Sequence, residues 1–175
     1  MSAWDSTGLS PKDQPRFDYV NRDQIPEELK EVFDSIVGSQ RGVGTLSNGA
    51  LPGPFNGWMY TDPEMARALD GIGMAVRSNT SNVPKTMKEV AICVIGAHFR
   101  SNVEFWAHSR IALAAGVRQE VLDSIYNSEK PSFSDNGEEP FQKAAYDMAM
   151  EYLDGYRVSD ETYQTVLDLL GSEKA

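Results

Sequence analysis

The stretch that decides the fold is KEVAICVIGAHFRSNVEFWAHSRIALAAGV, residues 88–117. Its first part belongs to a segment, 86–99, that is almost wholly apolar after Glu89. The length of that segment and its Pro-Lys-Thr entry favour a buried helix over a buried strand. The second part predicts a helix over about 101–115, because Gly116 suits a left-handed C-cap. Two apolar helices are therefore expected in direct succession.

Working outward, the sequence predicts five more helices. Each begins at a favourable first turn or carries apolar residues at helical spacing. The first is expected after Ile25-Pro26 as far as Gly38, and the second from Thr61 or Asp62, with an apolar stripe of Met65, Leu69, Ile72 and Val76. The other three are expected near 119–126, 141–154 and 160–170. No stretch shows sustained alternation of apolar and polar residues. We therefore expect an all-α protein of about seven helices.

Two segments are not expected to form helices. Residues 1–24 are rich in Ser, Pro, Asp and Gln and predict a flexible N-terminal arm, followed by a single helical domain over 25–175. Residues 38–57 hold many glycines and prolines, so no regular element is expected there, only a long ordered loop or a pocket wall.

Composition excludes several classes of function. The chain has 175 residues, 16 Lys and Arg against 26 Asp and Glu, and a formal net charge of −10, which repels nucleic acid and anionic lipid. No apolar run approaches the roughly 20 residues that span a bilayer, and no secretory signal is recognisable. We expect a cytoplasmic protein that binds neither nucleic acid nor membrane. Its single cysteine, Cys93, excludes a disulfide within the chain.

The chemistry is expected around the only two histidines, His98 and His108. Glu104 lies four residues before His108, so the two share a helical face, and a carboxylate beside an imidazole in an apolar pocket can perform acid–base catalysis. Glu89 could reach this face only if the two helices pack antiparallel. The spacing leaves an alternative open, because Ser101 and Glu104 also form a Ser-x-x-Glu capping box.

Two other interpretations of these residues are a purely structural role and a metal site. His108 could be an ordinary core histidine and His98 a partner of a helix dipole. A metal site is not expected, because the His and Glu spacing matches no dense ligand motif.

The 88–117 stretch resembles the signature of the carboxymuconolactone decarboxylase family, which includes the alkyl hydroperoxidase D-like proteins. Those proteins show a Glu, a Cys-x-x-Cys pair about twelve residues on, and a His four residues after the second Cys. Counted from Glu89, the cysteine positions fall on Ser101 and Glu104, and the histidine falls on His108. LPGPFNGWMYTDPEMARAL, residues 51–69, is similar to the family's Gly-Pro-Phe segment and the helix after it.

The resemblance covers about residues 50–127 and implies an alkyl hydroperoxidase D-like fold that assembles into a homotrimer or homohexamer. Because both cysteines are replaced, the chain resembles the decarboxylase branch, whose Glu and His work without a cofactor. The implied function is a lyase resembling 4-carboxymuconolactone decarboxylase, acting on a small unsaturated lactone or enolisable acid.

In that hypothesis the catalytic residues are His108 as the acid, Glu104 as its orienter or proton shuttle, and His98 as an electrophile or second proton carrier. Residues expected to bind the substrate or shape its pocket are Arg100, Arg110, Trp58, Tyr60, Trp106, Glu89 and Ser101. Three alternatives stay open at this point: an isomerase, dehydratase or cyclase acting on a related aromatic or polyketide-like substrate; a peroxide-handling oxidoreductase; and a helical oligomer that binds a small molecule without turning it over.

Overall fold

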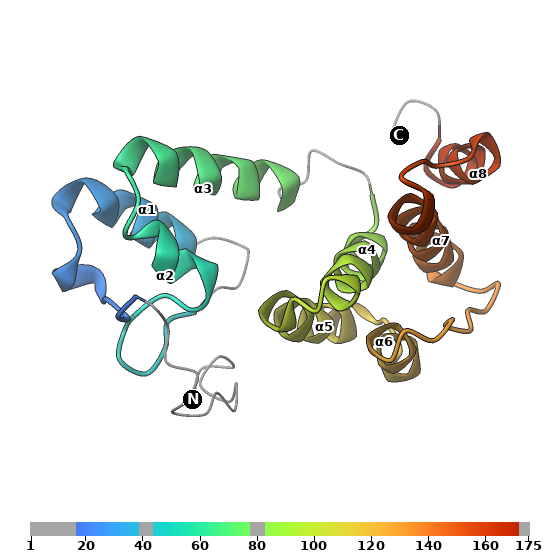
Figure 1. Cartoon of the computed structure of the whole chain (residues 1–175), viewed down its shortest axis with the longest axis horizontal. Coiled ribbons are helices and arrows are strands. Elements are labelled where there is room, and N and C mark those ends of the chain that lie inside the picture. Colours follow the sequence, from blue (N-terminus) through green and yellow to red (C-terminus); the bar gives the residue numbers. More distant parts are fainter. Residues whose placement is uncertain (1–16, 39–43, 78–82, 172–175) are drawn as a thin grey trace. The chain divides into compact units, whose positions relative to one another are not determined.

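The computed structural model describes residues 17–38, 44–77 and 83–171. Within these ranges the chain is helical, without a strand, and its only β-contact is an isolated bridge between Asn21 and Ala50 (Figure 1). Its eight α-helices are α1 (Glu27–Gly38), α2 (Pro54–Trp58), α3 (Pro63–Arg77), α4 (Lys85–His98), α5 (Asn102–Ala115), α6 (Gln119–Tyr126), α7 (Glu139–Gly155) and α8 (Asp160–Leu170). The all-α class is confirmed.

The chain divides into two compact units, Met1–Ser81 and Asn82–Ala175. We call them the N-terminal and the C-terminal unit and describe each by itself. The single domain expected over 25–175 stays a prediction. Over the part of the chain that the structure describes, no helix is long and apolar enough to cross a membrane.

The N-terminal unit is built around α1, whose apolar face is buried as the sequence predicts. This face packs with residues from the following loop and from α3, and the core comprises Ile25, Leu29, Val32, Phe33, Ile36, Leu51, Met59 and Ala66. A partly buried hydrogen bond also joins the two helices, because the Ser35 hydroxyl donates to the Asp70 carboxylate at 2.7 Å. The predicted start of α3 is confirmed, since the Asp62 carboxylate accepts a hydrogen bond from the Glu64 N–H.

The prediction that 38–57 holds no regular element was wrong for α2. Gly53 adopts a positive φ of 53°, which suits glycine, and Pro54 begins the helix, where its missing N–H is harmless. Asn56 of this helix is buried and binds the chain entering the unit: its Oδ1 accepts from the Val20 N–H and its Nδ2 donates to the Asp18 carbonyl. Glycine and proline here position a short helix instead of preventing one.

The last part of the predicted arm has defined contacts. Residues 22–24 form a 3-10 turn, in which Asn21 and Gln24 make a reciprocal capping box. Residues 1–16 lie outside the described residues, so the flexible arm stays a prediction for them.

Most of the apolar stripe predicted for α3 is exposed. Met65, Ile72 and Val76 are each more than half exposed, while the residues of this helix that are buried are Ala66 and Asp70. Helix α3 therefore packs on α1 through a small and a polar residue, and its bulky apolar side chains face outward from the N-terminal unit.

The C-terminal unit has α4 at its centre, in contact with α5, α6 and α7, while α8 packs on α7. Its core includes Val90, Cys93 and Val94 of α4, all buried. The predicted end of α5 is confirmed, because Gly116 adopts the left-handed conformation with φ 106°. Helices α6 and α8 occupy the residues that the sequence predicts.

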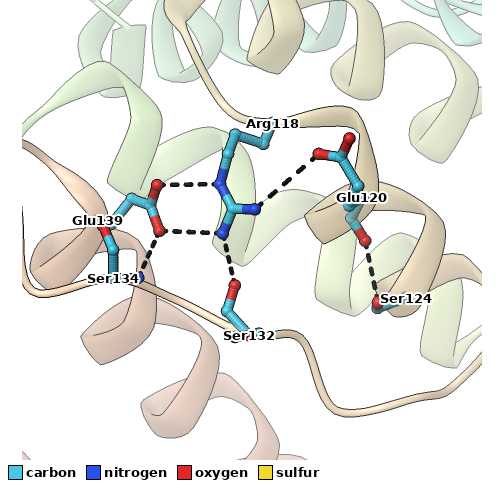
Figure 2. Close-up of polar contacts among 6 residues, drawn as sticks. All are labelled: Arg118, Glu120, Ser124, Ser132, Ser134 and Glu139. Atoms are coloured by element: carbon cyan, nitrogen blue, oxygen red, sulfur yellow. Dashed lines mark hydrogen bonds and ion pairs between the residues drawn. The ribbon is translucent and has the colours of Figure 1, made fainter.

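A polar cluster fastens the loop between α6 and α7 (Figure 2). The Arg118 guanidinium donates to both carboxylate oxygens of Glu139, at 2.9 and 3.1 Å, and to the Ser132 carbonyl at 2.6 Å. The Ser134 N–H also donates to Glu139. These hydrogen bonds lower the pKa of Glu139, first through Arg118 and then through the Ser134 backbone. Arg118 and Glu139 lie 21 residues apart, so no local sequence pattern indicates this cluster.

Candidate functional site

Glu89 of α4 and His108 of α5 form a buried pair in the C-terminal unit. The His108 Nδ1 lies 2.6 Å from Glu89 Oε2, and the two side chains are 7% and 5% exposed. When the Glu89 carboxylate is ionised it only accepts hydrogen bonds, and the His108 Nδ1–H is then the donor. This contact fixes the tautomer and the orientation of the ring, and it leaves Nε2 as the nitrogen that faces other groups.

The antiparallel packing of α4 and α5 brings these two residues together. Gly96, near the end of α4, lies against Phe105, near the start of α5, while Glu89 and His108 meet farther from the turn. A Cβ at Gly96 would be only 3.2 Å from the Phe105 backbone nitrogen, so glycine permits this close approach. The condition under which Glu89 could join the site is therefore met.

Glu104 lies on the other side of the imidazole. Its Oε2 is 3.5 Å from His108 Nε2, and its side chain is 46% exposed, in contrast to the buried Glu89. His108 is thus placed between two carboxylates, one buried at Nδ1 and one reaching solvent at Nε2. The shared helical face predicted for Glu104 and His108 is confirmed.

The predicted capping box at the start of α5 does not form. Ser101 is the N-cap residue, but its side chain accepts no capping hydrogen bond. Its backbone N–H, which Glu104 would bind in a capping box, donates instead to the Gly96 carbonyl at 2.8 Å. The tight turn between α4 and α5 uses that donor, and so the Glu104 carboxylate is directed to His108.

The other predicted site residues at this turn are exposed. His98 ends α4, and its ring lies against the Phe99 ring with centroids 4.8 Å apart. Arg100 follows with a positive φ of 52°, which is uncommon for a residue other than glycine, and its backbone N–H donates to Ala97. The structure does not record a contact of either side chain with Glu89, His108 or Glu104, and their roles at the site stay predictions.

Arg110 and Trp106 pair with each other. The Arg110 guanidinium stacks 4.2 Å from the centroid of the Trp106 ring, as a cation–π contact. Both residues are two positions from His108 on α5, and such positions project to nearly opposite sides of a helix. This geometry argues against Arg110 as the carboxylate clamp beside His108 within one chain.

Trp58 and Tyr60 belong to the N-terminal unit, where each has its own contacts. Trp58 packs edge-on against Phe55, with ring centroids 4.9 Å apart, and the Tyr60 hydroxyl donates to the Asp18 carbonyl at 2.8 Å. Their predicted part in a substrate pocket stays a prediction.

Cys93 is fully buried one helical turn after Glu89. Burial, followed by the nearby Glu89 charge, raises the pKa of its thiol from 9.0 to about 12. A thiol in these surroundings is a poor nucleophile, because the thiolate is the reactive form.

Two further features concern metal binding and surface depressions. In the described residues, no group of three or more His, Cys, Asp or Glu side chains is arranged to hold a metal ion. An open depression of about 480 Å³ lies where α7 meets α8, lined by Glu151, Asp154, Gly155, Arg157, Ser159 and Asp160. None of its lining residues belongs to the Glu89–His108–Glu104 group.

Comparisons with protein-family models, with curated proteins and with solved structures find no match to this chain. A buried carboxylate that orients an imidazole, with the second ring nitrogen directed toward a solvent-reaching carboxylate, can store, donate and recover one proton.

Proposed function

We propose that this chain is a cofactor-free lyase resembling 4-carboxymuconolactone decarboxylase. It would remove carbon dioxide from a small unsaturated lactone or enolisable acid, with His108 as the acid. One observation carries the proposal: His108 is held by the buried Glu89 at 2.6 Å, with Nε2 directed away from that contact. The Glu89-to-His108 spacing is also the spacing on which the family resemblance rests.

The reaction requires one proton at the right atom. When carbon dioxide leaves, the electron pair of the broken carbon–carbon bond stays on the substrate and is delocalised into an adjacent carbonyl or conjugated system. His108, protonated at both nitrogens, gives its Nε2 proton to the substrate carbon. Its Nδ1 keeps its own proton, which is hydrogen-bonded to Glu89. A positioned general acid of this kind contributes about 10²–10⁴-fold to a rate.

In this proposal Glu89 positions His108 and does not contact the substrate, which changes the role expected from the sequence. Its 5% exposure and its contact with Nδ1 support the change. Holding one tautomer matters greatly for a catalytic imidazole: in the Ser-His-Asp triad, which performs a different reaction, loss of the orienting carboxylate lowers the rate about 10⁴-fold. We also keep the proposal of a homo-oligomer, and the outward apolar residues of α3 support self-association.

The test is carbon dioxide release from 4-carboxymuconolactone in deuterated buffer, comparing wild type with His108→Gln. Wild type should release carbon dioxide and place deuterium on the product carbon, while His108→Gln should lose about 10²–10⁴-fold in rate. Glu120→Gln is the control, because Glu120 is an exposed acid of α6 outside the site, and it should retain the rate. His98→Gln tests the other predicted histidine separately: a rate like that of wild type would remove His98 from the catalytic residues.

The same residues also support proton transfer without loss of carbon dioxide, as in an isomerase, dehydratase or cyclase. Deuterium incorporation without carbon dioxide release would favour that alternative. Equal rates in wild type and His108→Gln would reject catalysis at this site and favour a binding protein. A peroxidase has the least support, because Cys93 is buried and its thiol pKa is about 12.

A further inference from the structure

His108 is poorly placed to exchange protons with water by itself. Its side chain is 7% exposed, and its Nδ1 is occupied by Glu89. A decarboxylation consumes one proton per turnover, because the carbon that loses carbon dioxide gains hydrogen. After each reaction the bare Nε2 must therefore receive a new proton through the few groups beside it.

Glu104 has the position that this reloading requires. Its Oε2 lies 3.5 Å from Nε2, and 46% of its side chain is exposed, so the carboxylate reaches both the imidazole and water. Exposed side chains change rotamer in picoseconds to nanoseconds, so movement of the Glu104 carboxylate toward and away from Nε2 is fast.

Two competing roles for Glu104 are already filled by other groups. Glu89 is the closer and more buried carboxylate, and it orients the ring. The Ser101 N–H, the donor that a capping carboxylate would bind, is taken by the Gly96 carbonyl. Glu104 is therefore left with Nε2 as its recorded partner.

We propose that Glu104 is the proton inlet of the site, which reloads His108 from solvent. In each cycle a hydronium ion or buffer acid protonates the Glu104 carboxylate. The carboxylic acid passes this proton to Nε2 and returns to its ionised form, and His108 becomes an imidazolium again. The proton then leaves on the product carbon. This inference rests on the proposed function, because only a reaction that uses the Nε2 proton needs it replaced.

The test measures proton exchange directly and requires no substrate. In protein labelled with ¹⁵N-histidine, NMR reports the exchange of the ring N–H protons with water. The chain has only two histidines, so His98→Gln assigns the signals of His108. In Glu104→Gln, which keeps the size of the side chain and cannot carry the proton, exchange at Nε2 should slow about tenfold or more.

A second variant separates proton transfer from structural effects. In Glu104→Ala, added formate should restore the exchange rate in proportion to its concentration, because a small carboxylic acid can enter the vacated space. Glu120→Gln is the matched control: Glu120 is also an exposed acid in the first helical turn, and it belongs to α6. That control should exchange like wild type.

Unchanged exchange in Glu104→Gln would overturn the inference, and so would slow exchange in Glu104→Ala that formate does not accelerate. Neither result would affect the proposed function, which depends on carbon dioxide release and on His108→Gln. Conversely, a slow, formate-dependent exchange would support the inlet even if 4-carboxymuconolactone proved not to be the substrate.

Discussion

Two carboxylates of the C-terminal unit each bind a nitrogen-bearing side chain, one a histidine and the other an arginine, and the two pairs differ in their exposure to solvent. Glu89 meets His108 at 2.6 Å with both side chains buried, and Glu139 meets Arg118 at 2.9 Å, where the arginine side chain is 44% exposed. In the second pair the Glu139 side chain is 17% exposed, but water still reaches the arginine in the folded chain, so the net contribution of the pair to stability is small. The first pair loses most of its hydration on folding, and this desolvation opposes the attraction between its members.

The difference separates two uses of the same kind of contact. Arg118 and Glu139 join three points of a loop, which is a structural role that needs no burial (Figure 2). Apolar residues would fill the space of Glu89 and His108 with less desolvation, so stability alone does not explain a buried polar pair there. The comparison therefore supports a functional role for the buried pair.

Removing one partner of the buried pair should have the largest effect. Glu89→Ala leaves a buried imidazole without its acceptor and opens a cavity, so we expect the free energy of unfolding to fall by about 3–5 kcal/mol. The double variant Glu89→Leu, His108→Leu should be about as stable as wild type, or more stable, and should be inactive. Urea unfolding measures both values.

Trp106 can follow the C-terminal unit alone in a Trp4→Phe, Trp58→Phe background, because the chain has three tryptophans. The exposed Glu120→Ala is the control and should change stability by no more than about 0.5 kcal/mol. If Glu89→Ala had an effect as small as this control, the two pairs would not differ as we argue.

The next effect concerns the close approach that lets the buried pair meet. In Gly96→Ala the new Cβ would be 3.2 Å from the Phe105 nitrogen, so α4 and α5 must separate slightly. We expect a loss of about 1–2 kcal/mol from overpacking. Gly71→Ala in α3 is the matched control, because no atom lies within 4 Å of its Cβ position, and it should gain about 0.5–1 kcal/mol from helix propensity.

Urea unfolding followed by circular dichroism gives the sign for each glycine variant. A stabilising Gly96→Ala would mean that the contact between the helices adjusts freely. In that case the 2.6 Å separation of Glu89 and His108 would not depend on the glycine.

Cys93 tests the low-polarity surroundings of Glu89 without altering the pair. Its pKa is raised from 9.0 to about 12, so at pH 8 the folded chain holds roughly a thousandfold less thiolate than the unfolded chain. A disulfide reagent such as DTNB should modify the native protein slowly and the urea-unfolded protein at once. Rapid labelling of the native protein would indicate that water reaches the core beside Glu89.

The same shift gives stability a pH dependence. Between about pH 9 and pH 12 the unfolded chain loses the thiol proton while the folded chain retains it, so the folded state becomes less favoured as pH rises. Cys93→Ala should show a shallower fall in this window, as measured by urea unfolding across pH. Equal slopes for Cys93→Ala and wild type would mean that a group other than Cys93 causes the loss of stability in this pH range.

Local features of the sequence predicted much of this architecture. Caps and apolar spacing located α1, α5, α6 and α8, because these signals act within one or two helical turns. The same local rules failed for α2, where Gly53 and Pro54 begin a helix. They also failed at Ser101, whose N–H is used by the turn with Gly96. At Ser101 the failure has a visible cause, because the backbone donor that the capping box needs is used by the turn between α4 and α5.

The site itself was predictable only in part. The spacing of Glu104 and His108 along one helix is local, and the structure confirms their proximity. The contact between Glu89 and His108 depends on how two helices pack, and the spacing could state only the condition for it. The outward stripe of α3 shows the same limit, since periodicity identifies an apolar face and does not say which element covers it.

Breaking the exposed pair should have the smallest effect, with an opposite pH dependence to that of Cys93. Arg118 lowers the pKa of Glu139 below its ordinary value of 4.5. The carboxylate therefore stabilises the folded state above about pH 4.5, and this contribution is lost as pH falls through the lowered folded value. Arg118→Ala should flatten the fall in stability on acidification and should reduce the urea midpoint near neutral pH far less than Glu89→Ala does.

The local effect of Arg118→Ala should exceed the global one. The Ser134 N–H donates to the Glu139 oxygen that Arg118 also binds, so its hydrogen exchange should accelerate when the loop is released. Glu120→Gln is the matched control, because it removes only the 3.9 Å contact on the other side of the guanidinium (Figure 2). A loss of stability in Arg118→Ala equal to that in Glu89→Ala would mean that exposure does not separate the two pairs, and the functional argument drawn from burial would fail with it.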